Sequence, residues 1–436
     1  MGSSLSQVAP PPAAPELGEK LPATAFILAI VLGILGALGA SVFILFMDSA
    51  QTWIWKDLPA AFGFTELPMW WVVLMLLIGA GIVALAWRLP GATGNSPLTG
   101  FHFDTPAINA PSILLAALGT LIFGFVLGPE APLIIMGTTI GALLMRGRAP
   151  QLVQMGMLLG GAAAIGAIFG NPFVMAFMLL EFAALGILPS IALMPALVAL
   201  GAGYLVQIGV GPWSGVGTHS LAVPGLPSYD NLTVTQLLAG LVIAVIASIV
   251  AAIAREFGER VAAVAAKHRA IVLFAVALLT AALAITVSEI TGVDVNMVLF
   301  SGQPAMTSLI AETSALTVVL VLVAKMLAYG MALGGGYRGG PIFPATFLGV
   351  AVGVLSALVF PDLSVTAMAA TGIAATATVM LRLPFTSALL AMILLSSSGV
   401  AVAPFAIMGA VVGFAVRQTL DKRDAKRAAT KEMEKT

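Results

Sequence analysis

The stretch GPEAPL, residues 128–133, decides which fold this chain can adopt. It sets Glu130 between Pro129 and Pro132, with apolar runs before and after it. An acidic residue at the centre of a bilayer costs about 3 kcal/mol on insertion scales. The fold must therefore supply this carboxylate with a compensating environment.

The composition of the chain is that of a membrane protein. Of its 436 residues, 60% are hydrophobic and 9% are charged, whereas soluble domains carry roughly 25% charged residues. Roughly ten apolar runs approach the ~20 residues of a spanning helix, among them residues 26–47, 69–87, 108–127, 237–254 and 271–287. These runs do not alternate polar and apolar residues as the strands of a membrane β-barrel do. We therefore predict an all-α polytopic membrane protein.

The same composition argues against several functions. The net charge is +0 without a long basic patch, which argues against a nucleic-acid partner. There is no cysteine, which excludes disulfides, thiol catalysis and cysteine-based metal sites. The histidines, His102, His219 and His268, lack metal-ligand spacing, so we predict no metal site and no cofactor. Because no nucleophile–base pair or phosphate loop is evident, a membrane enzyme ranks last among the functions considered.

An internal repeat organises the chain. Shifted by 212 residues, GPEAP at residues 128–132 falls on GPIFP at residues 340–344. The match continues without a gap through Gly137 on Gly349, Gly160 on Gly372, and Pro172-Phe173 on Pro384-Phe385. Transporters built from two such halves frequently have inverted topology. We predict two inverted half-repeats at 23–210 and 233–417, with a disordered tail at 1–22, a polar connection at 211–232 and a charged cytoplasmic tail at 418–436.

The two repeated elements are predicted to break a membrane helix and to start a new one. Glycine allows a sharp turn, and proline is accommodated in the first helical turn. The free N–H groups of that turn, with the helix dipole behind them, form an anion site inside the membrane. Irregular backbone at this depth is tolerated only where it lines a cavity or is buried in protein.

Glu130 is predicted to compete with the anion for that site. Negative charge at a helix N-terminus is favoured by ~0.3–1 kcal/mol, which offsets part of the cost of burial. Protonating the carboxylate, or swinging it away, frees the site for an anion, and this describes a gate sensitive to pH. The alternative is an acid that caps a helix at the membrane surface. We favour the gate because only one of the two matched elements carries an acid.

Two other charged residues lie in apolar runs. Glu181, in NPFVMAFMLLEFAAL, is interpreted either as a solvated group at a helix end or as a functional acid. Lys325, in VLVAKMLAYG, is interpreted as a snorkelling or helix-pairing lysine. Lysine and arginine concentrate at residues 255–269 and after residue 416, which predicts that both segments, and with them the C-terminus, are cytoplasmic. We expect the protein in the inner (plasma) membrane.

Together, these residues resemble the CLC family of chloride channels and chloride/proton antiporters. The family's G-(K/R)-E-G-P element, which holds a gating glutamate, corresponds to GPEAP at 128–132, and its G-x-F-x-P element to GPIFP at 340–344. Its NAPL and RAPLTG helices resemble GNPFVMAFMLLE and RLPFTSALLAM. The resemblance covers about residues 25–417 and looks most like a divergent bacterial branch of ion-transport proteins.

Two anion contacts of the family are altered in this sequence. The first family element, G-S-G-I-P, is reduced to GNSPL, so that one of Gly94, Asn95 and Ser96 stands for the anion-contacting serine. Pro341 lacks the backbone N–H that the family offers to the anion at that position, whereas the next two residues retain theirs.

The proton path implied by the family is altered as well. The inner proton-transfer glutamate of the antiporters aligns with Phe182, one residue past Glu181. Either Glu181 substitutes for it or the inner proton path is absent. The family's anion-contacting tyrosine has no counterpart after Tyr337, a feature shared with fluoride-type members.

The resemblance implies transport of a small inorganic anion, chloride foremost, through a glutamate-gated pore that is channel-like or weakly coupled to protons. It also implies a homodimer in the lipid bilayer with one pore per subunit. The alternatives are a proton-coupled fluoride exporter and a secondary transporter of another small anion, for example an organic one. The gating and proton-transfer candidates are Glu130 and Glu181. The candidate anion-binding residues are Gly94, Asn95, Ser96, Gly128, Ala131, Gly340, Ile342 and Phe343.

Overall fold

The computed structural model describes residues 23–91, 93–214, 222–223, 225–230 and 232–433. Nine helices among these residues are long and apolar enough to cross a membrane, and five shorter apolar helices of 10–17 residues accompany them. This architecture confirms the predicted all-α polytopic membrane fold. The predicted tail at 1–22 and His219 of the predicted polar connection lie outside the described residues.

The helices divide between the two halves of the chain. Those of the first half are α1 (Ala23–Thr52), α2 (Leu58–Ala61), α3 (Met69–Ala86), α4 (Ala110–Leu121), α5 (Glu130–Leu144), α6 (Pro150–Phe169), α7 (Pro172–Ala184) and α8 (Leu193–Ser214). Those of the second half are α9 (Val234–Ala265), α10 (Arg269–Thr291), α11 (Met306–Ile310), α12 (Ala315–Gly334), α13 (Ile342–Val359), α14 (Val365–Leu381), α15 (Pro384–Leu394) and α16 (Ala403–Met433).

Both repeated elements interrupt a membrane helix. The apolar run at 108–127 is helical over α4 and then breaks, and α5 begins at Glu130 with Pro129 as its N-cap. In the second half α12 is followed by a break, and α13 begins at Ile342 with Pro341 as its N-cap. At an N-cap the missing N–H of proline removes no intrahelical hydrogen bond. The predicted break points are therefore confirmed.

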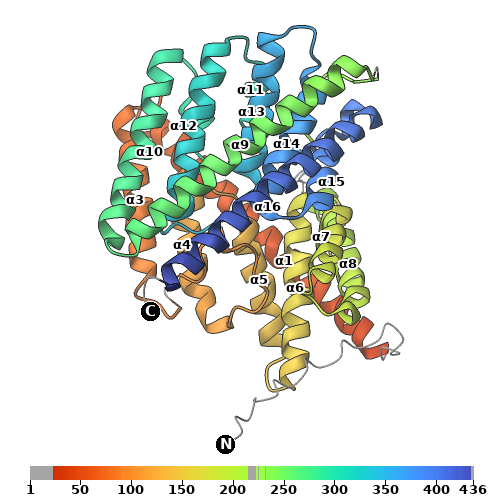
Figure 1. Cartoon of the computed structure of the whole chain (residues 1–436). Coiled ribbons are helices and arrows are strands. Elements are labelled where there is room, and N and C mark those ends of the chain that lie inside the picture. The colour runs from red at the N-terminus through yellow and green to blue at the C-terminus, as the bar shows by residue number, and fades with distance from the viewer. Residues whose placement is uncertain (1–22, 92, 215–221, 224, 231, 434–436) are drawn as a thin grey trace, which may run out of the picture.

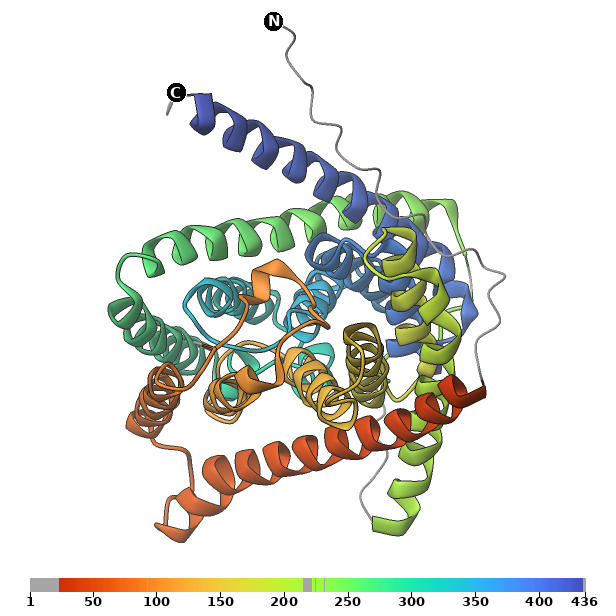
Figure 2. The same cartoon turned by 90° about the horizontal axis from the view of Figure 1, so that it is seen from below.

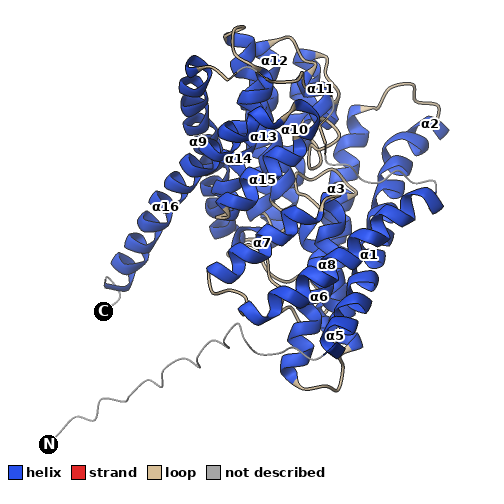
Figure 3. Cartoon of the chain, turned by 90° about the vertical axis from the view of Figure 1, so that its right-hand side faces the viewer, coloured by secondary structure: helices blue, strands red, loops and turns tan. Residues whose placement is uncertain are grey.

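The offset of 212 residues found in the sequence is also the offset between equivalent helices. Helices α5 and α13 start at Glu130 and Ile342, and α7 and α15 start at Pro172 and Pro384. From the breaks, α5 and α6 extend toward one end of the molecule, whereas α13 and α14 extend toward the other (Figure 1, Figure 3). The two halves are therefore inverted relative to each other, as predicted.

Repeated glycines let the helices of each half approach closely. Gly137 of α5 packs on Gly160 of α6, where a Cβ at Gly137 would lie 2.6 Å from the carbonyl carbon of Gly160. The equivalent Gly349 of α13 packs on Gly372 of α14, where a Cβ would lie 2.5 Å from the carbonyl carbon. A side chain at either position would force the helices apart. The repeat in the sequence is thus a repeated helix–helix contact in space.

Long helices enclose the broken ones. Seen from below in Figure 2, α1 (red), α9 (green) and α16 (dark blue) lie along the perimeter, and α5 and α13 lie inside. The perimeter helices expose apolar side chains, such as Val42 at 67% and Leu238 at 63%, as expected of a surface that faces lipid. The break elements lie inside this wall, as irregular backbone at membrane depth requires.

Lys325 of α12 is fully buried, so the interpretation that it snorkels to the surface is wrong. Its ammonium group donates to the three carbonyl oxygens of residues 297–299 at 2.9–3.2 Å, at the end of the short helix η5 (Val295–Met297). Its Nζ also lies 4.4 Å from the ring centroid of Phe347 on α13. The lysine therefore joins α12, α13 and the η5 segment, and backbone oxygens compensate its charge.

We expect Lys325→Met to lower the free energy of unfolding by about 3 kcal/mol or more, because it leaves three buried carbonyl groups without a donor. Thermal unfolding of the detergent-solubilised protein, followed by tryptophan fluorescence, measures the loss. Lys56→Met is the matched control, since Lys56 is exposed and should tolerate the change. Equal stability of Lys325→Met and the wild type would contradict the role given to this lysine.

Candidate anion-binding site

The two break elements pair with each other through their backbones. The N–H of Gly128 donates to the carbonyl of Gly340 at 2.8 Å, and the N–H of Gly340 donates to the carbonyl of Gly128 at 2.5 Å. This isolated antiparallel bridge brings the first turns of α5 and α13 together. Both glycines are candidate anion-binding residues, and in this structure the N–H group of each donates to the carbonyl of the other.

The carboxylate of Glu130 occupies the N-terminus of α13. Its Oε1 accepts hydrogen bonds from the N–H groups of Ile342 and Phe343, each at 3.0 Å. These first-turn groups have no acceptor within their own helix. Glu130 is 0% exposed. The carboxylate oxygen thus stands where a helix N-terminus would hold a free anion, and it uses two of the candidate anion donors.

Two glycines leave room for this carboxyl group. A Cβ at Gly128 would lie 2.7 Å from Oε1 of Glu130, and a Cβ at Gly340 would lie 2.8 Å from the Cβ of Glu130. Glycine is therefore required here by the close approach of the glutamate. The second carboxylate oxygen, Oε2, is buried and has no hydrogen-bond partner among the described residues. Oε1 therefore makes the hydrogen bonds that join the carboxylate to α13.

Tyrosines that the sequence analysis did not select fix the segment before α13. The Tyr329 hydroxyl donates to the carbonyl of Pro341 at 2.8 Å. Tyr337 stacks on Phe125 with ring centroids 3.8 Å apart, and its hydroxyl donates to the carbonyl of Leu273 at 2.7 Å. The sequence shows only aromatic rings with a polar atom in apolar surroundings, which does not reveal the carbonyl that each hydroxyl meets.

Two pockets reach the start of α5 from different sides. The α5 pocket, with a cavity volume of about 50 Å³, includes Ala131 and Pro341 and continues along α5 to Ile135. The α11 pocket, with a cavity volume of about 630 Å³, includes Pro129 and extends to Thr307 of α11. The residues on either side of Glu130 thus line different pockets, and the glutamate itself lines neither. Glu130 marks the boundary between them.

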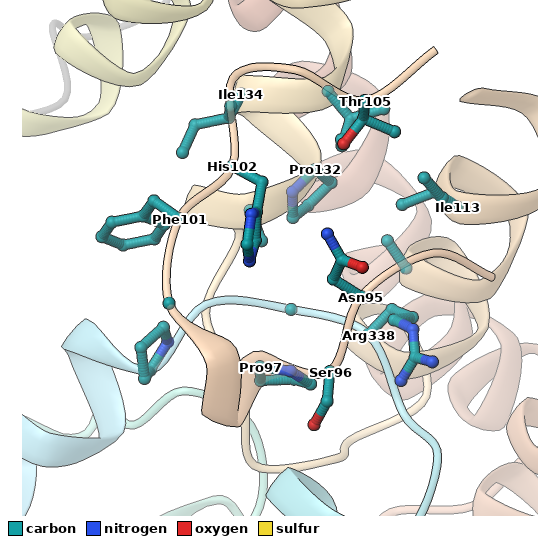
Figure 4. Close-up of a pocket in the computed structure, with 16 residues that line it drawn as sticks. Asn95, Ser96, Pro97, Phe101, His102, Thr105, Ile113, Pro132, Ile134 and Arg338 are labelled. Carbon is teal, nitrogen blue, oxygen red and sulfur yellow. The ribbon is translucent and has the colours of Figure 1, made fainter. Parts of the chain in front are cut away.

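The candidate residues of the GNSPL stretch lie at the α5 pocket. Asn95 and Ser96 line it, and Figure 4 shows the Asn95 side chain between Pro132 and Arg338. The Ser96 hydroxyl accepts the N–H of residue 98 at 3.3 Å and donates to the carbonyl of Leu333 on α12 at 3.4 Å. Gly94 is not part of the lining. The structure therefore brings Asn95, Ser96 and the Ala131 candidate to one pocket beside the break elements.

Arg338 is a residue of this site that the sequence analysis missed. It lines the α5 pocket, and its guanidinium donates to the carbonyls of Thr93 at 2.6 Å and Gly94 at 3.2 Å. Its backbone N–H donates to Oγ1 of Thr120 at 3.0 Å. The available signal was a charged residue two positions before Gly340 in an otherwise apolar stretch.

Glu181 lies elsewhere, at the N-terminus of α15. Its carboxylate accepts the N–H groups of Phe385 at 2.9 Å and Thr386 at 2.7 Å, and also the Thr386 hydroxyl. Glu181 lines neither the α5 pocket nor the α11 pocket. It therefore satisfies the first-turn donors of a helix in the other half of the chain, and it is not brought to the Glu130 site.

The chemistry offered by this site is that of anion binding. Its donors are backbone N–H groups at the start of α13 and the guanidinium of Arg338 in the adjoining pocket. Within the part of the chain that the structure describes, no three His, Cys, Asp or Glu side chains gather closely enough to hold a metal ion. N–H and guanidinium donors recognise negative charge.

Comparison with known sequences gives a family and two relatives. The sequence model of a family described as "Voltage gated chloride channel" matches residues 95–418. A putative ion-transport protein YfeO of Escherichia fergusonii is 26% identical over 341 residues, which cover 75% of this chain and 77% of that protein. The YfeO protein of an Escherichia coli strain is 27% identical over 339 residues, with the same coverage.

Two antiporters are among the solved structures that resemble this fold. A slow cyanobacterial Cl⁻/H⁺ antiporter superimposes with a TM-score of 0.74 and 17% identity, covering 92% of this chain and 96% of that one. A CLC-type fluoride/proton antiporter superimposes with a TM-score of 0.67 and 20% identity, covering 91% of this chain and 96% of that one. At these identities the likeness concerns the fold alone.

We expect Gly340→Ala to destabilise the protein by about 1–3 kcal/mol, because the new Cβ overlaps Glu130. In a Glu130→Gly background the same substitution should cost less, since the overlapping atoms are gone. A double-mutant cycle based on thermal unfolding measures this coupling. Gly349→Ala meets the backbone of Gly372 instead, so its cost should not depend on the residue at position 130. Equal costs of Gly340→Ala in both backgrounds would refute the close contact.

Proposed function

Since the chain belongs to the voltage-gated chloride channel (CLC) family and serves anion transport, we propose that it carries chloride along a path gated by Glu130. The observation that carries this proposal is the pair of 3.0 Å hydrogen bonds from Ile342 and Phe343 to Oε1 of Glu130. N–H groups that hold a carboxylate oxygen can hold a chloride ion after the carboxylate leaves. The conformation described here is then the closed one.

The two pockets provide the rest of the path. The α5 pocket ends at Ala131 and the α11 pocket ends at Pro129, on either side of the gate residue. Movement of the Glu130 side chain away from α13 leaves its seat to the ion and joins the two pockets. Protonation favours this movement, because a neutral carboxyl group loses the attraction of the helix N-terminus. Anion flux is therefore expected to rise as the pH falls.

We place the α5 pocket on the cytoplasmic side of the plasma membrane. The connection after α5 carries Arg146 and Arg148, and α16 ends in a basic segment with Lys422 and Arg423. Both lie toward the lower end of the molecule in Figure 1. Excess lysine and arginine marks the cytoplasmic side of membrane proteins. The C-terminus is then cytoplasmic as well.

We propose that anion movement is passive or only loosely coupled to protons. Glu181, the nearest acid in the sequence to the family's inner proton-transfer position, is held by three donors from Phe385 and Thr386. These donors make Glu181 the cap of α15, and Glu181 lines neither of the pockets beside Glu130. This supports a capping role for Glu181 and leaves Glu130 as the residue that takes up a proton.

Fluoride is the second candidate for the transported anion. In its favour is the missing tyrosine after Tyr337, a feature shared with fluoride-type members of the family. The CLC-type fluoride/proton antiporter also shares the fold, although its identity of 20% carries no argument about the anion. The same liposome assay with chloride and with fluoride separates the two candidates.

A homodimer with one pore per subunit is the proposed assembly. Helices α7 and α15 pack against each other and carry the repeated Pro-Phe pair, of which Phe173 is 61% and Phe385 is 69% exposed. Aromatic side chains on this surface face either lipid or a second copy of the chain. We place the second copy of the chain against this exposed face of α7 and α15.

Glu130→Gln tests the gate. In liposomes loaded with chloride, we expect its efflux at neutral pH to exceed that of the wild type about tenfold, because the helix N-terminus no longer holds a charged competitor. The wild-type flux should rise with acidification, and the variant flux should not. Ion-selective electrodes for chloride and fluoride, used in parallel, measure both quantities. A variant with wild-type flux and wild-type pH dependence would end the gating proposal.

Glu181→Gln tests the coupling. We expect unchanged anion flux and unchanged proton movement under a chloride gradient, together with a loss of about 1 kcal/mol in stability from the weakened cap of α15. A pH-sensitive dye inside the liposomes reports proton movement, and thermal unfolding reports stability. Proton movement that disappears while chloride flux persists would make Glu181 the inner proton-transfer group instead.

A further inference from the structure

The α5 pocket contains a fixed positive charge that the gate does not use. Arg338 has five N–H groups, and three backbone carbonyls each take one: Thr93 at 2.6 Å, Tyr337 at 2.8 Å and Gly94 at 3.2 Å. Across the described ranges, no acceptor takes the remaining two, and no carboxylate forms an ion pair with this guanidinium. The charge is thus held in place by the backbone but is not neutralised.

A second arginine lies near Arg338, and the lining of the α5 pocket contains no acidic residue. The α5 pocket is lined by no aspartate or glutamate. Arg269 lies close to Thr93, because its Nη2 donates to Oγ1 of Thr93 at 3.5 Å. Its guanidinium also lies 4.0 Å from the ring centroid of Trp87. Two arginines therefore meet at Thr93 next to a pocket without acids. Such a pocket raises the local concentration of anions.

The walls of the α5 pocket are largely apolar. The apolar side chains of the lining include Phe101, Ile113, Pro132, Ile134 and Ile135, shown in part in Figure 4, and Asn95, Ser96, His102 and Thr105 add polar groups. An anion that enters gives up part of its hydration shell, and this loss must be compensated by charge or hydrogen bonds. A guanidinium is more weakly hydrated than an ammonium group, so it offers its charge at a low cost in its own hydration. The pocket thus suits an anion that dehydrates readily.

We propose that Arg338 is a specificity-determining residue that supplies the charge for a partly dehydrated halide in the α5 pocket and favours chloride over fluoride. Fluoride is the smaller ion and holds its water more strongly, so apolar walls penalise it more. The inference rests on the proposed function and deepens it, because it names the feature that selects the anion. Since backbone carbonyls fix the guanidinium, its charge is in place before the ion arrives.

The test uses a Glu130→Ala background, in which the gate is absent and the pocket alone limits affinity. Chloride and fluoride efflux from liposomes is measured over a range of concentrations for the background protein and for the added Arg338→Gln and Arg338→Lys. Arg148→Gln is the matched control, since Arg148 is exposed and lies outside the pocket. We expect Arg338→Gln to raise the half-saturating chloride concentration about tenfold or more and to lower the chloride-to-fluoride ratio. The control should change neither.

Arg338→Lys separates charge from structure. It keeps the positive charge but replaces the guanidinium with a strongly hydrated ammonium group, so half-saturation should stay within about threefold while the chloride-to-fluoride ratio falls. This variant also keeps the proposal testable if Arg338→Gln fails to fold. Both variants could lose thermal stability while the half-saturating chloride concentration and the chloride-to-fluoride ratio stay as in the background protein. In that case Arg338 only holds the backbone at Thr93 and Gly94 in place, and the proposal is overturned.

The two proposals fail in different ways. If the background protein moves neither anion, the proposed function fails, and calorimetric titration of the purified proteins with sodium chloride and sodium fluoride still decides the role of Arg338. Weaker chloride binding by Arg338→Gln than by the background protein supports it, and equal binding overturns it. If the background protein moves both anions and Arg338→Gln leaves both curves unchanged, the specificity proposal alone fails.

Discussion

The first-turn N–H groups of α13 start a helix inside the membrane region and need a negative partner, and the rest of the site depends on this need. Water is not freely available at that depth, so each unmet donor costs free energy. Glu130 supplies one carboxylate oxygen to two of these donors. The glycine bridge between Gly128 and Gly340 makes room for it, and the two pockets approach on either side. The proposed function follows from this requirement, because it lets a small anion take the place of the carboxylate at the same donors.

Backbone groups at helix interruptions also stabilise the other charges inside this fold. Lys325 donates to three carbonyls at the end of η5, and the Arg338 side chain donates to the carbonyls of Thr93, Gly94 and the adjacent Tyr337. Within the described residues neither forms an ion pair. A pair of opposite charges would cancel the field around it, whereas a charge held by carbonyl dipoles keeps its net sign. Among the described residues, backbone carbonyls and not carboxylates therefore compensate both of these charges.

Much of the fold could be predicted from the sequence, because the repeat is exact where packing is tightest. The pairs Gly137/Gly349 and Gly160/Gly372 keep their spacing because a Cβ at any of them would push helices apart. The break elements could also be predicted from the sequence, since proline and glycine act locally. The contacts of charged and aromatic side chains could not be predicted in this way. The Glu181 cap on α15 joins residues more than 200 positions apart, and the partners of Lys325 are carbonyl groups, which every residue possesses. Such contacts depend on helix placement that periodicity does not encode.

The inverted repeat makes the two halves of the chain similar, but Glu130 has no acidic counterpart in the second half. The position equivalent to Glu130 in the second half is Ile342, whose N–H group the glutamate binds. Glu181 makes a similar interaction with α15, yet it is partly exposed, takes three donors and adjoins neither pocket. Glu130 is sealed, has one oxygen without a partner, and separates two pockets. Two carboxylates thus cap two helices of the same half. Only Glu130 is flanked in the sequence by residues that line two different pockets, which is why the proposed gate is assigned to Glu130 and not to Glu181.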